Sequence, residues 1–77
     1  MDYIKDRIAY AKADLKILKA NGEMAITGTK LGPIWLKYEK GLFRATDTLG
    51  KQLMDPTYEE EEIMFFIASN YAFAIVN

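Results

Sequence analysis

The last third of this chain joins four glutamates to a long apolar segment, and this combination limits what the sequence can fold into. The glutamates occupy residues 59–62, and residues 63–76 contain Ser69 and Asn70 as their only strongly polar positions. Acidic side chains favour the start of a helix because they complement the positive end of its dipole. A helix with so little polar surface is not stable on the outside of a small protein. The sequence therefore predicts a helix that is buried inside the fold or against a second molecule.

The residues just before the glutamates indicate where this helix begins. Thr57 and Glu60 have the spacing of a capping box, in which each side chain accepts a hydrogen bond from the backbone N–H of the other residue. Asp55 and Pro56 precede them, and proline disrupts a helix that would extend further back. We therefore expect a helix that Thr57 caps.

The length and composition indicate one small domain with apolar surface to spare. The chain has 77 residues, so we expect a single α+β domain over residues 1–77, near the size at which one core is marginally sufficient. Hydrophobic residues make up 51% of the sequence, and a domain this small keeps a large share of its residues at the surface. Part of that apolar surface is expected to contact a partner.

The side chains that carry most catalytic and metal chemistry are missing. The sequence contains no cysteine and no histidine, which excludes disulfides, a conventional zinc site and a Ser-His or Cys-His nucleophile. Consecutive carboxylates at 59–62 point in different directions around a helix and make a weak cation site at best. Residues 28–30 lack the spacing of a phosphate-binding loop, and Ser69 lies in an apolar helix without a base. We expect no enzyme activity, no metal and no cofactor.

Charge is divided unevenly along the chain, although the formal net charge is −1. Residues 1–54 carry all ten basic residues and six acidic ones, whereas residues 55–77 carry five acidic residues and no basic one. One interpretation is that these charges solvate separate elements; the other is a bipolar molecule that docks head to tail or presents one pole to a partner. The small net charge provides no global field that would attract nucleic acid or an anionic membrane.

The sequence predicts a cytoplasmic protein without a membrane partner. Its first turns contain Asp2, Lys5, Asp6 and Arg7, which is not the pattern of a signal peptide. The apolar run over residues 63–76 is shorter than the roughly 20 residues that a membrane-spanning helix needs.

Residues 2–20 predict an amphipathic helix capped by Asp2. Its apolar positions are spaced alternately by four and three residues, which places them on one stripe. These positions are Ile4, Ile8, Ala11, Leu15 and Leu18. Asn21 and Gly22 predict the end of the helix, because they provide the left-handed residue that closes many helices.

The middle of the chain predicts antiparallel strands. Residues 34–38 and 42–46 flank a tight turn near Lys40-Gly41 and form the clearest hairpin pattern. Residues 24–27 are a further strand candidate. Residues 47–54 fit a third strand, a helical turn or an ordered loop, and the pattern does not decide between them.

The register of the hairpin depends on the length of its turn. A two-residue turn makes Tyr38 face Phe43 on the core side of the sheet. It also makes Lys37 face Arg44 on the opposite side. A three-residue turn would instead pair Leu36 with Arg44, which is a poorer hydrophobic match, so the pattern favours the shorter turn.

These elements predict an α+β fold: an N-terminal helix, a two- or three-stranded antiparallel sheet with a hairpin near Lys40-Gly41, and a C-terminal helix. Both helices are expected to pack on one sheet face. The predicted core comprises Ile4, Ile8, Leu15, Leu18, Ile34, Leu36, Tyr38, Ile63, Ile67, Tyr71 and Ile75.

The second face of the hairpin is the first candidate binding surface. The register that buries Tyr38 directs Trp35, Lys37, Leu42 and Arg44 outward together. A like-charge pair next to an indole is unfavourable for the sheet itself but suits an anionic partner, a stacked base or a protein interface. The alternative is that Trp35 packs under residues 47–54 and the cations solvate the sheet.

The C-terminal helix provides a second candidate surface. Its expected polar stripe contains two phenylalanines, Phe66 and Phe73. Either loops of the domain cover them, or they form a seam for a homodimer or another partner.

Together these observations favour a non-enzymatic protein-protein interaction module that occupies a surface of a larger host macromolecule. Such a chain suits a small accessory or inhibitory protein of phage or mobile-element type. Its expected partner is another protein, with a homodimer as a further possibility. The alternative function is a nucleic-acid or nucleotide binder in which Trp35 stacks a base while Lys30, Lys37, Lys40 and Arg44 contact phosphates.

Overall fold

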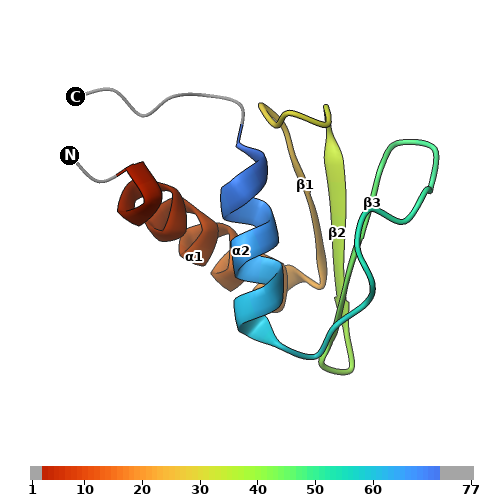
Figure 1. Cartoon of the computed structure of the whole chain (residues 1–77). Coiled ribbons are helices and arrows are strands. Elements are labelled where there is room, and N and C mark those ends of the chain that lie inside the picture. The colour runs from red at the N-terminus through yellow and green to blue at the C-terminus, as the bar shows by residue number, and fades with distance from the viewer. Residues whose placement is uncertain (1–2, 72–77) are drawn as a thin grey trace.

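Figure 1 shows a computed structural model of the chain, which describes residues 3–71, with side chains from Arg7 onward. In chain order the elements are α1 (Tyr3–Asn21), β1 (Glu23–Ile26), β2 (Ile34–Glu39), β3 (Leu42–Thr46) and α2 (Glu60–Asn70). The strands form one antiparallel sheet in the order β1-β2-β3, and both helices lie on the same side of it (Figure 1). The helices contact each other, and α1 also contacts β1 and β2. The predicted α+β fold is confirmed.

The hairpin has the predicted two-residue turn and register. Tyr38 pairs with Phe43, and Lys37 pairs with Arg44. Lys40 and Gly41 both have positive φ, at 52° and 84°, as a turn that matches the twist of a hairpin requires. Gly41 adopts this conformation without a steric penalty, whereas the Cβ of Lys40 makes it less favourable there.

The third strand of the sheet is β1, which precedes the hairpin in the chain and pairs with β2. It begins one residue before the predicted strand over residues 24–27. Residues 47–54 form an ordered loop. The Asp47 carboxylate accepts hydrogen bonds from the backbone N–H groups of Leu49 and Lys51, both at 2.8 Å. The chain then returns along the outer edge of β3, where the Leu53 N–H donates to the Ala45 carbonyl at 2.9 Å. This loop therefore covers the edge that β3 would otherwise expose.

The predicted capping box at the start of α2 is not formed. Phe43 and Thr57 exchange backbone hydrogen bonds of 2.8 and 3.1 Å, so the backbone of Thr57 extends the pairing of β3. Its side-chain oxygen accepts from the N–H of Glu59 at 3.0 Å, one residue short of Glu60. The helix begins at Glu60 with Glu59 as its N-cap residue, because Thr57 cannot serve the sheet and the helix at once.

The core lies between the sheet and the two helices. Its buried residues are Ala11, Leu15, Leu18, Ile26, Ile34, Leu36, Phe43, Ala45, Ile63, Ile67, Ala68 and Tyr71. Ile8 and Tyr38, which the sequence placed in the core, are partly buried against this cluster. The side chain of Ile4 and residue Ile75 lie outside the described part of the chain.

One face of α2 is buried inside the fold, whereas its first three glutamates and Phe65 are exposed. The rest of the predicted apolar run, residues 72–76, lies outside the described residues. Ile63, Ile67 and Ala68 of α2 are buried in the core. The helix ends at Asn70, whose carbonyl accepts from the Lys30 N–H at 2.8 Å, and Tyr71 follows in an extended conformation. Within residues 3–71, no helix has the length and apolar character to span a bilayer.

Candidate binding surface

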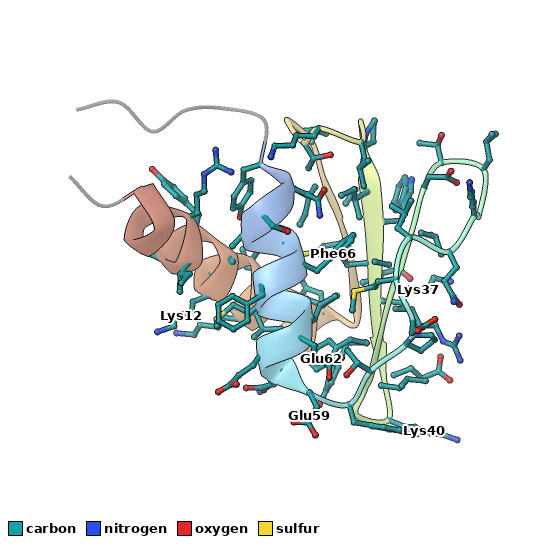
Figure 2. All side chains as sticks on the ribbon, in the orientation of Figure 1. Lys12, Lys37, Lys40, Glu59, Glu62 and Phe66 are labelled. Carbon is teal, nitrogen blue, oxygen red and sulfur yellow. The ribbon has the colours of Figure 1, made fainter. Side chains whose placement is uncertain are left out.

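The face of the sheet opposite the helices, termed the open face below, carries the candidate site. Alternation along the strands directs to it the side chains of Glu23, Ala25, Trp35, Lys37, Glu39, Leu42, Arg44 and Thr46. Trp35 is 47% exposed, Lys37 and Arg44 are exposed, and Leu42 is half-buried. Figure 2 shows Lys37 on the side of the sheet away from α2. The structure thus brings together the four hairpin residues that the sequence grouped.

Lys37 and Arg44 are directly opposite each other in the sheet. Glu23 pairs with Lys37 from the other side, so the row reads Glu23, Lys37, Arg44 across the three strands. Like charges facing each other destabilise a sheet, and one acid beside two cations leaves a local excess of positive charge. This row can accept an anionic group from a partner.

Trp35 lies in the neighbouring row, between Ala25 and Thr46. Both neighbours are small, so the indole is not covered by adjacent side chains of the sheet. The 47–54 loop follows the outer edge of β3, where Gln52 bridges to Thr46. Trp35 keeps about half of its surface exposed, so this loop does not bury it.

Sequence reasoning missed two exposed apolar side chains near this surface. Leu49 is 91% exposed in the Asp47 turn, which directly follows the Thr46 partner of Trp35. Tyr58 is exposed near the hairpin turn, where its ring lies 3.7 Å from the position that a Cβ at Gly41 would occupy. For Leu49, the signal was an apolar residue between Asp47 and Gly50, which are typical turn residues.

The two phenylalanines of the C-terminal stripe do not join the open face. Phe66 is half-buried and packs against the core, pointing from α2 toward the sheet (Figure 2). Phe73 lies outside the described residues. Their role in partner binding stays a prediction. Phe65 is instead the exposed phenylalanine of α2, at 53%.

Polar contacts between the helices use part of the uneven charge within the chain. Lys19 of α1 forms an ion pair with Glu60 at the start of α2, and this hydrogen bond and charge raise the pKa of Lys19. At the other end of α2, the Arg7 guanidinium donates to the Ala68 and Tyr71 carbonyls at 3.5 and 3.1 Å. Each contact places a charge where the helix dipole favours it. These contacts join the two helices at both ends of α2.

The pKa of Tyr71, which follows α2 and contacts α1, is shifted strongly. Its hydroxyl donates to the Asp14 carboxylate at 2.5 Å, and its ring packs edge-on against Tyr10 with centroids 6.4 Å apart. Burial, followed by the hydrogen bond to Asp14, raises the pKa of Tyr71 well above its ordinary value. The neutral phenol is therefore favoured in the folded state.

Tyr71→Phe is expected to change how stability depends on alkaline pH. Because the folded-state pKa is raised, the contribution of Tyr71 is complete below the unfolded value of about 10 and is lost as pH rises beyond it. The variant should lack this part of the alkaline decline and lose about 1–3 kcal/mol at neutral pH with the bond to charged Asp14. Urea unfolding from pH 7 to 11 measures both effects. Tyr58→Phe, at an exposed tyrosine, is the control, and an alkaline slope identical in wild type and Tyr71→Phe would contradict the assignment.

The described part of the surface contains no arrangement suited to metal chemistry. Among the residues that the structure describes, no group of three or more His, Cys, Asp or Glu side chains is placed to hold a metal ion. The chain matches no protein-family model, no curated protein and no solved structure.

Proposed function

We propose that this chain is a non-enzymatic protein-binding module that occupies a surface of a larger partner through the open face of its sheet. The observation that carries the proposal is a half-exposed indole, Trp35, beside the adjacent cations Lys37 and Arg44. Tryptophan and arginine are among the residue types most enriched in binding hot spots. The turn that follows Thr46, the sheet partner of Trp35, carries a further exposed apolar side chain, Leu49.

The chemistry of the face favours a partner segment with one carboxylate next to an apolar side chain. A carboxylate between Lys37 and Arg44 would relieve their repulsion and accept a bidentate hydrogen bond from the guanidinium. An apolar side chain of the same partner segment would cover the indole, because the row of Trp35 is next to the row of Lys37 and Arg44 on this face. Affinity would then come from the buried indole, and orientation from the charge.

The flanking acids make nucleic acid a poorer fit. Glu23 lies beside Lys37, and Glu39 pairs with Leu42 at the hairpin end of the same face. The positive zone is therefore one pair wide and bordered by negative charge, whereas a nucleic acid presents a continuous row of phosphates. The net charge of −1 adds no attraction.

The wider assignment follows from size and composition. We place the chain among small accessory or inhibitory proteins of phage or mobile-element type, because it offers an exposed surface and its sequence contains no cysteine or histidine. A cytoplasmic location agrees with the absence of cysteine, since small exported domains often depend on disulfides.

Trp35 is the single tryptophan of the sequence and therefore reports directly on binding. Its fluorescence is titrated with a synthetic peptide of alternating glutamate and leucine, with the same peptide carrying glutamine for glutamate, and with single-stranded oligo(dT). We expect a saturable change with the acidic peptide and about tenfold weaker binding for Arg44→Gln, which corresponds to a loss of about 1.4 kcal/mol. Lys30→Gln, at an exposed lysine outside both the open face and the helices, is the matched control and should bind the peptide as wild type.

Three outcomes would overturn this function. Equal binding of the glutamate and glutamine peptides would remove the role of charge, and an unchanged affinity in Arg44→Gln would remove the role of this face. Binding of oligo(dT) that weakens steeply with salt would instead establish the nucleic-acid alternative.

A further inference from the structure

We propose that two copies of this chain form a two-fold dimer through their helices, in which a basic groove on α1 of each copy receives the start of α2 of the other. The groove has a volume of about 220 Å³ and is lined by Lys12, Leu15, Lys16 and Lys19. It belongs to the helix layer, on the other side of the molecule from the open face (Figures 1 and 2). The inference is therefore independent of the proposed function.

The groove has the chemistry of a site for an anionic, partly apolar group. Its three lysines are spaced by four and three residues and share one stripe of α1, where like charges repel one another. Lys19 is paired with Glu60, but Lys12 and Lys16 have no ion-pair partner among residues 7–71. Leu15, which is 8% exposed, provides an apolar floor between them.

The start of α2 supplies both kinds of group that the groove requires. The ion pair between Lys19 and Glu60 fixes the first turn of α2 directly beside the lysine stripe. Glu61 is exposed one residue further on, and Phe65, on the same stripe of α2 as Glu61, is about half exposed. An acidic and aromatic ridge therefore lies next to a basic and apolar groove on one surface.

Such a surface is complementary to itself. A two-fold rotation that places one molecule opposite another brings Glu61 of one copy to the lysines of the other, and the reverse, so every contact is made twice. The groove is open to solvent along α1, so an aromatic side chain of a second copy can reach it. In this arrangement Phe65 of one copy covers Leu15 of the other.

These features favour a second copy over other anionic occupants. A polyanion with many phosphates would meet the neighbouring acids at residues 59–62 as well as the lysines. A second copy instead places its acidic residues on the lysines of the first copy, and its lysines receive the acidic residues of the first copy. It also leaves both open faces pointing away from the interface.

Sedimentation equilibrium of the full chain tests the dimer through charge reversal. Lys16→Glu and Glu61→Lys should each weaken the dimer at least about tenfold, because each reversal replaces two attractive contacts by repulsive ones. An equimolar mixture of the two variants should recover dimerisation. In the mixed dimer, the carboxylate introduced at position 16 of one copy meets the ammonium introduced at position 61 of the other, and the second contact keeps its native lysine and glutamate.

Matched controls separate this surface from the rest of the molecule. Lys51→Glu and Glu39→Lys change the same charges at exposed positions outside the helices and should dimerise as wild type. Phe65→Ala should weaken the dimer, while Trp35→Ala should not. Wild type that stays monomeric at the highest attainable concentration would overturn the proposal. So would charge-reversal variants that dimerise as wild type, or a mixture that fails to recover.

Discussion

Ile63→Ala is expected to lower the free energy of unfolding by about 2–5 kcal/mol, a large part of the total of roughly 5–15 kcal/mol that a small domain possesses. Ile63 is fully buried on the face of α2 that joins the core. Truncating its side chain forfeits the transfer of three methyl or methylene groups from water and leaves a cavity in the core. Urea unfolding followed by circular dichroism measures the loss.

The matched control lies two residues further along the same helix. Phe65 is larger than Ile63, but about half of its surface is exposed, so Phe65→Ala should cost far less. Both variants are compared at a protein concentration where the wild type is monomeric, which separates folding from association. Equal losses in the two variants would show that α2 does not pack with the orientation described.

The hairpin was predictable because its signals are local. Alternation of apolar residues over 34–38 and 42–46 and a glycine in the turn determine which side chains share a face. The exposure of Trp35, Lys37 and Arg44 follows from the same alternation once the helices cover the opposite face.

The start of α2 was mispredicted because a distant contact overrides a local signal. Thr57 and Glu60 fit a capping box, but the backbone of Thr57 pairs with Phe43, fourteen positions earlier in the chain. A short-range motif contains no information about this pairing. The same limit applies to residues 47–54, whose path along β3 depends on which sheet edge is free.

The sequence alone did not determine on which side of α2 Phe66 lies. Helical spacing placed Phe66 on the polar stripe with Glu62, yet in the fold Phe66 turns toward the sheet while Phe65 is exposed (Figure 2). The rotation of a helix about its axis depends on what it packs against, and a mainly apolar helix leaves that rotation undetermined by sequence. The lysines of the basic groove share one face of α1, but the sequence alone did not show that the start of α2 lies beside them.

Phe43→Ala is expected to have the largest effect, a loss of about 3–5 kcal/mol. Phe43 is the second residue of β3 and is 1% exposed. Its ring packs on Tyr38 with centroids 4.7 Å apart, and its backbone holds Thr57 just before α2. The substitution therefore leaves a cavity, removes an aromatic pair worth about 0.5–1.5 kcal/mol and loosens the strand that positions the second helix.

A loss of this size would show that Phe43 connects the sheet to the segment that leads into α2. Urea unfolding of Phe43→Ala should show a midpoint far below that of the wild type. Because so small a domain is only marginally stable, the variant is expected to be at most partly folded at about 37 °C. Leu49→Ala is the control, because that side chain is 91% exposed and should change stability by less than about 0.5 kcal/mol. A Phe43→Ala variant that loses no more than this control would mean that β3 does not lie between Tyr38 and Thr57 as described, and the open face would lose the scaffold that aligns Arg44 with Lys37.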